Sequence, residues 1–393
     1  MCTGRQTHVN QRNKRGFGRI ALLAGMLGLG GLALAGCEVQ GPGGFLGEWL
    51  QMGEPDPITP EAQELQNFWV WTWVTAWVIG IIMWILMLYH AFFSTAKRAA
   101  KKGKGEFPNQ LQYNIPLEIV LTFIPIAITM TLFFNTVRAE DAATALNKNP
   151  QVVVDVTAFQ WNWKFGYQQI AQDLIPAEAL AGQTVENGFY MGVDEARTEQ
   201  AEYTKKDRDA QGNVLTKELD GQEYEWGGPI HGNSKSDHSF LHYNDIETLG
   251  SSDEVPVLVL PSNTAIEFQL ASADVNHAFW VPQFMYKHDA YAHPEMNNSQ
   301  RAFQVASIDQ EGAFVGRCAE MCGTYHAMMN FELRVVSPDA FRNYIGYRLQ
   351  NPDATNAEAL QSIGEEGYAT STHPFITGRM DTRQGPNVID QNA

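Results

Sequence analysis

The longest uncharged segment of the chain restricts its fold more than any other feature. Between Gln66 and Lys97 no residue carries a formal charge, and the run NFWVWTWVTAWVIGIIMWILMLYHAFF is long enough to cross a bilayer core, which needs roughly 20 apolar residues. Trp69, Trp71 and Trp73 lie near one end of this run, as in the aromatic belt of a membrane interface. We therefore expect a transmembrane helix.

A second apolar segment, Ile115–Val137, follows after a basic loop. It contains Glu118 and Pro125, and we expect the proline to kink a second transmembrane helix. The loop between the segments carries Lys97, Arg98, Lys101, Lys102 and Lys104. The positive-inside rule assigns this loop to the cytoplasm. Residues 66–138 are thus predicted to form a transmembrane hairpin, with the chain beyond Arg138 outside the cell.

The N-terminus has the pattern of a targeting segment. Basic residues up to Arg19 precede the run IALLAGMLGLGGLALAG, which is too short and too glycine-rich to be read as a spanning helix. The run ends in LAGC, Leu34–Cys37, which resembles a bacterial lipobox. That resemblance implies a lipoprotein signal peptide over residues 1–36, lipid on Cys37, and an external segment over 37–65. An ordinary signal peptide followed by a chance cysteine is the alternative.

Beyond Arg138 the sequence changes to short segments rich in β-branched and aromatic residues. These segments are PQVVVDVTAFQWNWKF, EVPVLVLPSNTAIEFQLAS, HAFWVPQF, RAFQVASI and NFELRVVS. They predict an all-β domain, a sandwich or barrel, over residues 139–336. Residues from about 168 to 251 are polar and acidic, and we expect them to be an insertion between strands. Ser337 and Pro338 predict a helix start within the C-terminal part, 337–393, which then continues as a polar tail ordered only against a partner.

The cysteines restrict the chemistry of the external domain. The chain has four, of which Cys2 leaves with the signal peptide and Cys37 takes the lipid. Cys318 and Cys322 remain, in the loop RCAEMCGTYHAMM. Their spacing by itself is compatible with a disulfide, and cysteine together with histidine is compatible with structural zinc.

A thioether in the same loop favours copper over these alternatives. Met329 follows His326, and sets of thiolate, imidazole and thioether are characteristic of copper redox sites. Two thiolates can bridge two metal ions, which requires a second imidazole from elsewhere. His277, in SADVNHAFWVPQ, is placed at a strand end and can supply it.

These motifs together resemble subunit II of the haem-copper cytochrome c oxidases. The resemblance covers the helix hairpin, QWNW, DVNHAFWVPQ and the whole of C-x-E-x-C-x-x-x-H-x-x-M. It implies a cupredoxin-like Greek-key domain with the dinuclear copper centre called CuA. The implied copper ligands are His277, Cys318, Cys322, His326 and Met329 through their side chains, and Glu320 through its backbone carbonyl.

The resemblance also implies roles beyond the copper ligands. The Glu320 carboxylate would face a magnesium ion at the interface with subunit I. Trp161 would receive electrons from cytochrome c, and Glu118 would lie at the mouth of a proton pathway into subunit I. Copper would pass the electrons to haem a of an aa3-type oxidase, which reduces O2 to water and pumps protons. Subunits I and III are implied partners.

Charge and the lipobox refine the expected partner. The formal net charge of −17 disfavours nucleic acid and favours a basic partner, and we expect Asp274 to attract a basic cytochrome surface. The lipobox and the acidic insertion are most similar to the actinobacterial branch, in which the donor is a membrane-bound dihaem cytochrome of a bcc complex in a supercomplex. The expected location is the bacterial cell membrane, with two passes and with the lipid and copper domain on the external face.

Other function classes fit the sequence less well. A quinol oxidase subunit II lacks the copper ligands, and nitrous oxide reductase, which has a similar motif, lacks the membrane helices. A lipoprotein that only delivers copper or acts as a scaffold would leave the basic loop and Glu118 without a role. The stretch KHDAYAHPEMNNSQR is longer than usual for the family, and His288 stands where a methionine is expected. Both could affect the surroundings of His277.

Overall fold

The computed structural model describes residues 49, 51–103, 112–193, 211, 213, 242–251, 254–291 and 301–373 in full, and the backbone of 215–219 and 222–226. The predicted signal segment, Cys37 and Lys104 lie outside these residues. The chain divides into two compact units. One consists of Met1–Gly53 with Gln66–Glu140, and the other of Glu54–Leu65 with Asp141–Ala393.

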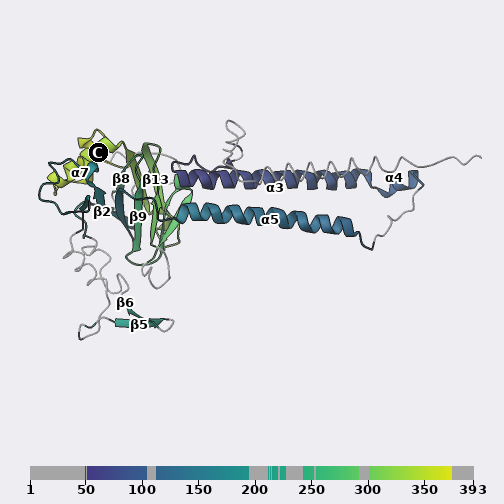
Figure 1. Cartoon of the computed structure of the whole chain (residues 1–393), viewed down its shortest axis with the longest axis horizontal. Coiled ribbons are helices and arrows are strands. Elements are labelled where there is room, and N and C mark those ends of the chain that lie inside the picture. Colours follow the sequence, from purple (N-terminus) through teal and green to yellow (C-terminus); the bar gives the residue numbers. More distant parts are fainter. Residues whose placement is uncertain are drawn as a thin grey trace, which may run out of the picture. The chain divides into compact units, whose positions relative to one another are not determined.

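The first unit contains the two predicted membrane helices. The helices are α3 (Pro60–Phe93), the short α4 (Ala96–Lys101) and α5 (Ile115–Thr144) (Figure 1). The apolar windows of α3 and α5 have mean hydropathies of 2.0 and 2.1, and none of either window is buried. Apolar side chains exposed along such lengths need a lipid environment, which agrees with a membrane anchor. The α5 helix continues through Pro125.

Most of the second unit is a sandwich of two β-sheets. One sheet has seven strands: β1 (Val152–Phe159), β2 (Asn162–Ala171), β3 (Val185–Glu186), β4 (Phe189–Met191), β7 (Glu247–Leu249), β9 (Ile266–Ser272) and β12 (Ala302–Val305). The other has five: β8 (Val257–Pro261), β10 (His277–Val281), β11 (Tyr286–Ala290), β13 (Gly312–Cys318) and β14 (Asn330–Val336). The hairpin of β5 (Leu215–Leu219) and β6 (Gln222–Trp226) forms a separate ladder.

Aromatic rings from both sheets fill the space between them. Trp163 of β2 packs against Phe331 of β14 with ring centroids 5.3 Å apart, and Phe279 of β10 packs against Phe268 of β9 at 5.4 Å. All four side chains are buried. This apolar layer lies directly beneath the loop RCAEMCGTYHAMM, because Met329 belongs to the same buried cluster. The predicted fold class, a membrane hairpin followed by a cupredoxin-like sandwich, is confirmed.

Outside the expected insertion, two strands were not among the predicted segments. The β13 strand contains Gly312 and Gly316, residues that lower β-propensity. Gly316 pairs with Phe331 on β14, and a Cβ atom at Gly316 would lie 2.0 Å from that ring. The glycine is therefore needed so that Phe331 can pack over its neighbour. The β11 strand, Tyr286–Ala290, is half-buried and polar, so that its pairing with β10 decides its conformation.

The expected insertion contributes to the sheet at both of its ends. The β2 strand continues to Ala171, β4 pairs with β2, and β7 pairs with β2 before the chain enters β8. Tyr190 and Ile246 within this stretch are buried. The part between 194 and 241 lies largely outside the described residues.

The C-terminal part is more ordered than expected. The α7 helix (Pro338–Gln350) begins as predicted, with the Ser337 hydroxyl accepting from the backbone N–H of Ala340. A second helix, α8 (Asn356–Ser362), follows behind a capping box formed by Thr355 and Glu358. The prediction of a tail without its own structure was wrong for this segment, because the capping signal T-x-x-E was overlooked.

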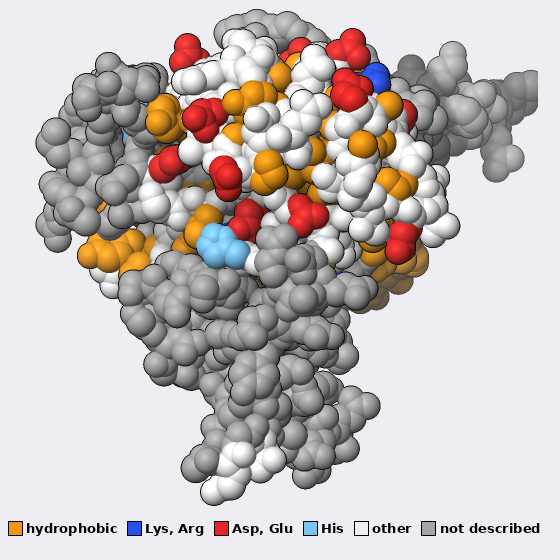
Figure 2. All heavy atoms as spheres, turned by 90° about the vertical axis from the view of Figure 1, so that its left-hand side faces the viewer, with side chains coloured by type: hydrophobic (Ala, Val, Ile, Leu, Met, Phe, Trp, Pro, Cys, Tyr) orange, Lys and Arg blue, Asp and Glu red, His pale blue; other side chains and the backbone are white. Residues whose placement is uncertain are grey.

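A buried ion pair ties the next segment to the sheet. Glu332 of β14 is fully buried and accepts from the backbone N–H groups of Thr370 and Ser371, both at 2.6 Å. Its other oxygen accepts from Arg334, which also donates to Glu365 at 3.0 Å. Figure 2 shows acidic side chains spread over one face of the molecule with few basic ones, in line with the net charge of −17.

Candidate metal centre

Two neighbouring strands and one loop present the candidate ligands. His277 is the first residue of β10 and Cys318 the last of β13, and the antiparallel register pairs Phe279 with Cys318. Cys322 and Met329 follow in the loop between β13 and β14. Strand pairing therefore brings together residues that lie 41 positions apart in the sequence.

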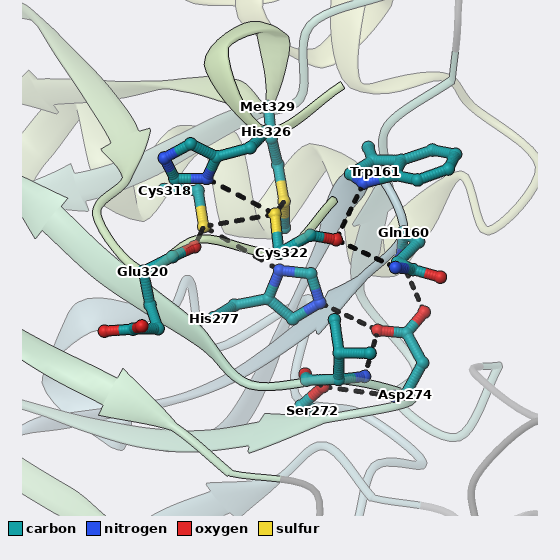
Figure 3. A network of polar contacts seen from close by, with 11 residues as sticks. Gln160, Trp161, Ser272, Asp274, His277, Cys318, Glu320, Cys322, His326 and Met329 are labelled. Atoms are coloured by element: carbon teal, nitrogen blue, oxygen red, sulfur yellow. Dashed lines mark hydrogen bonds and ion pairs between the residues drawn. The ribbon is translucent and has the colours of Figure 1, made fainter. Parts of the chain in front are cut away.

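The sulfur and nitrogen atoms of this group face one another (Figure 3). Cys318 Sγ lies 3.7 Å from Cys322 Sγ and 3.7 Å from His277 Nδ1. Cys322 Sγ lies 3.4 Å from His326 Nδ1 and 3.9 Å from Met329 Sδ. The carbonyl oxygen of Glu320 is 3.2 Å from Cys318 Sγ. All six residues predicted from the sequence are thus brought together.

The two cysteines are not joined in a disulfide. Both are free and buried, and their sulfurs are much farther apart than the roughly 2.0 Å of a disulfide bond. His277, Cys318 and Cys322 form a group whose ligand atoms all lie within 4.8 Å of one another. Two soft sulfurs, each with its own imidazole nitrogen, and an additional thioether are a donor set that suits copper. A structural zinc site needs four ligands, typically without a thioether.

The pKa values of the Cys318 and Cys322 thiols are shifted because the two groups lie close together. A hydrogen bond from Cys322 stabilises the thiolate of Cys318 and lowers its pKa to about 3, against the opposing effect of burial. The same bond raises the pKa of Cys322, because its proton is shared with that thiolate. Burial lowers the pKa of His277, but hydrogen bonds with Asp274 and Cys318 outweigh it and the pKa is raised. The metal-free site therefore retains protons that a cation would displace.

Asp274 occupies a different position from the one expected. Its side chain is only 12% exposed, and its Oδ1 atom lies 2.8 Å from His277 Nε2. Its other oxygen accepts from the backbone N–H of Gln160 at 2.6 Å. The sequence analysis expected this carboxylate to attract a basic cytochrome surface; in the structure both of its oxygens are engaged inside the domain.

Trp161 lies beside the ligand loop. Its Nε1 atom donates to the carbonyl oxygen of Cys322 at 3.0 Å, and Gln160 Nε2 donates to the same oxygen at 2.8 Å. The ring of Tyr325 packs edge-on against Trp161 with centroids 4.9 Å apart. Gly323 has a φ of +118°, and a Cβ there would lie 3.2 Å from the Trp161 ring. The sequence analysis did not single out Gln160 or Tyr325, although both adjoin recognised motif residues.

The two carboxylates with predicted roles, Glu320 and Glu118, lie in different parts of the structure. The Glu320 carboxylate is 42% exposed and lies 3.7 Å from the ammonium group of Lys287. Glu118 is in the first turn of α5, where its carboxylate accepts from the backbone N–H of Asn114 at 2.8 Å. His288 of β11 stacks on Phe303 with ring centroids 5.6 Å apart. Most of the lengthened loop, 292–300, lies outside the described residues.

Comparisons with known proteins agree on one family. The family described as "Cytochrome C oxidase subunit II, periplasmic domain" matches residues 236–336, which include all the candidate ligands. Cytochrome c oxidase subunit 2 of Corynebacterium glutamicum is 60% identical over 380 residues, covering 97% of this chain and 99% of that protein. Its counterpart in Mycobacterium tuberculosis H37Rv is 41% identical over 374 residues, covering 95% and 93%.

One solved structure is more distant. The periplasmic domain of subunit II of cytochrome oxidase of Bradyrhizobium japonicum is 20% identical, covers 52% of this chain and 96% of its own, and has a TM-score of 0.26. The family assignment therefore rests on the sequence relatives.

Proposed function

We propose that this chain, which belongs to the cytochrome c oxidase subunit II family, holds the dinuclear copper centre through which an aa3-type oxidase receives electrons from cytochrome c. Haem a in subunit I would take these electrons on toward the reduction of O2 to water, coupled to proton pumping. The observation that carries the proposal is the pair of buried, unbonded sulfurs of Cys318 and Cys322, each with an imidazole nitrogen within 3.7 Å.

The donors would come from both strands and loop. The proposed ligands are the side chains of His277, Cys318, Cys322, His326 and Met329, with the carbonyl oxygen of Glu320. When bound, two copper ions would supply a one-electron carrier whose charge is spread over both metals. Met329 is 1% exposed and covers the sulfur atoms against water. Trp163, fully buried, donates from Nε1 to the Met329 carbonyl at 3.3 Å and holds the end of the loop in place.

A rigid donor set suits electron transfer. A carrier that changes geometry little between its redox states needs little rearrangement of its surroundings for each electron. Both ends of the ligand set belong to paired strands, since His277 begins β10 and Cys318 ends β13. Trp161 supports a path for the incoming electron, because its indole is partly exposed and hydrogen-bonded to Cys322.

Glu320 and Glu118 have other roles in this proposal. Glu320 would bind magnesium at the interface with subunit I through its half-exposed side chain. Glu118 would lie at the mouth of a proton pathway into subunit I, a role supported by the cost of placing a carboxylate in an apolar helix.

The proposed setting is the bacterial cell membrane. The two apolar helices would cross it, and the copper domain would lie on the external face with lipid on Cys37. Subunits I and III would be partners in the oxidase. The relatives from Corynebacterium and Mycobacterium support an actinobacterial arrangement, in which the donor is the membrane-bound dihaem cytochrome of a bcc complex within a supercomplex.

The proposal is tested on the purified oxidase complex. We expect copper bound to the wild-type chain to show the electron spin resonance hyperfine pattern of one unpaired electron shared by two copper nuclei. Cys322→Ser removes one of the two proposed thiolate ligands with little change in volume and should abolish this pattern. Ser307→Ala, at a half-buried position after β12 that is not among the proposed ligands, is the control and should leave it unchanged. Zinc in the wild-type site, or a disulfide between Cys318 and Cys322, would contradict the proposal.

A further inference from the structure

Asp274 lies in the turn that joins β9 to β10, three residues before His277. One carboxylate oxygen, Oδ1, lies 2.8 Å from His277 Nε2 and also accepts from the backbone N–H of Val275 at 2.7 Å. The backbone N–H of Asp274 donates to the hydroxyl of Ser272 at 3.1 Å. The turn is therefore held by its own hydrogen bonds, and the carboxylate is fixed in direction before any metal is bound.

The contact with Asp274 determines which nitrogen of His277 can bind a metal. A carboxylate accepts hydrogen bonds, so the Nε2 atom that faces it carries the proton. The lone pair of the neutral ring is then on Nδ1, which lies 3.7 Å from Cys318 Sγ. Metal-bound histidines commonly have such a partner, which orients the ring and makes its free nitrogen more basic. Because His277 is fully buried, water cannot take over this function.

The second oxygen of the same carboxylate reaches the turn that carries Trp161. Oδ2 accepts from the backbone N–H of Gln160 at 2.6 Å. Gln160 Nε2 and Trp161 Nε1 both donate to the carbonyl oxygen of Cys322, at 2.8 and 3.0 Å. One side chain thus joins the histidine ligand to the β1–β2 turn, which is itself joined to a cysteine ligand (Figure 3).

We propose that Asp274 is a positioning residue that holds His277 and the Gln160–Trp161 turn in a single arrangement and sets the redox potential of the copper centre. This inference rests on the proposed function, since it concerns a site that holds copper. It assigns the carboxylate to the interior of the domain, where it acts through the histidine ligand.

The charge of Asp274 determines the direction of the effect. A negative charge hydrogen-bonded to a ligand favours the oxidised centre, which is the more positive form. Asparagine at this position removes the charge and keeps the size. Its amide can still accept from His277, but its NH2 group then faces the Gln160 N–H, and two donors repel one another. The oxidised centre should lose stability relative to the reduced one, and the Trp161 turn should loosen.

The experiment uses the intact oxidase complex with Asp274→Asn, and with Asp353→Asn as the matched control. Asp353 is an exposed carboxylate in the turn after α7. At a fixed applied potential we expect the ratio of reduced to oxidised copper centre to rise roughly tenfold in Asp274→Asn. The copper hyperfine splitting should change with it, and the control should match wild type in both measurements. Asp274→Glu, which keeps the charge, should restore most of the potential.

Three outcomes separate this inference from the proposed function. Absence of copper from the wild-type complex would remove the proposed function itself. A wild-type complex with copper but an unchanged potential and spectrum in Asp274→Asn would overturn only the inference. An unchanged potential with slower, less salt-dependent association of the donor would assign Asp274 to docking. If Asp274→Asn does not assemble, Asp274→Ser takes its place, because serine also removes the charge. An unchanged potential and hyperfine spectrum in that variant would overturn the inference.

Discussion

The indole Nε1 of Trp161 donates a 3.0 Å hydrogen bond to the backbone carbonyl of Cys322. The ring and the thiol of Cys322 are thereby connected through one hydrogen bond and the few covalent bonds of a single residue. Such a connection is well suited to electron transfer from a donor that contacts the exposed part of the ring, and it gives Trp161 a physical reason for its proposed role.

Replacing Trp161 with phenylalanine should slow electron transfer to the copper centre without changing copper binding. Trp161→Phe keeps an aromatic ring but removes the N–H donor, while Gln160 still donates to the Cys322 carbonyl. We expect slower electron transfer from donor to copper, an unchanged copper spectrum, and a free energy of unfolding lower by about 1 kcal/mol. Stopped-flow reduction of the copper centre measures the rate. A wild-type rate would exclude Trp161 from the path.

The ring of Tyr325 should also contribute to electron transfer from the donor to copper. It packs edge-on against Trp161, and such pairs contribute about 0.5–1.5 kcal/mol beyond burial of their area. Tyr325→Ala should therefore loosen the Trp161 ring and slow transfer from the donor, whereas Tyr325→Phe, the matched control, should behave as wild type. Indole fluorescence anisotropy and the reduction rate provide the two readouts. Equal rates in both variants would show that the ring contact has no part in transfer.

Copper loading should depend on pH in a defined direction. The shared hydrogen bond lowers the pKa of Cys318 to about 3 and raises that of Cys322, so that near neutral pH the pair retains one proton. The hydrogen bonds of His277 outweigh its burial and raise its pKa as well. Copper must displace these protons, and its apparent affinity should rise with pH and fall as pH is lowered.

Chelator competition at several pH values measures this dependence. Each proton released changes the apparent affinity by about tenfold per pH unit. Release of protons into a weakly buffered solution on addition of copper gives an independent count. An apparent affinity that does not change with pH would mean that the metal-free site holds none of these protons.

The buried carboxylate of Glu332 should stabilise the C-terminal segment. It accepts from the backbone of Thr370 and Ser371 and is paired with Arg334. Glu332→Gln leaves Arg334 without its buried counter-charge, and we expect a loss of about 3 kcal/mol in the free energy of unfolding. Hydrogen exchange over residues 365–371 should become faster.

A matched control uses the exposed partner of the same arginine. Glu365 is 39% exposed, and Glu365→Gln should cost less than about 1 kcal/mol because solvent screens the pair. Equal losses in the two variants would show that burial of Glu332 is not the cause.

The sequence by itself determined the features that depend on near neighbours. The apolar lengths of α3 and α5, the strand character of β1, β8 and β14, and the start of α7 at Ser337 all follow from composition and spacing over a few residues. The ligand loop is equally local, since Cys318, Cys322, His326 and Met329 lie within twelve positions of one another.

Only the tertiary structure decided the contacts that control the site. Asp274 meets the Gln160 backbone 114 positions away, and Trp161 meets the Cys322 carbonyl 161 positions away. No local pattern predicts such pairs, because they depend on the register of strands and on which face of a turn is buried. Asp274, which the sequence analysis considered only as a charge that attracts a cytochrome, is placed by strand pairing beside His277, where water competes little for its hydrogen bonds.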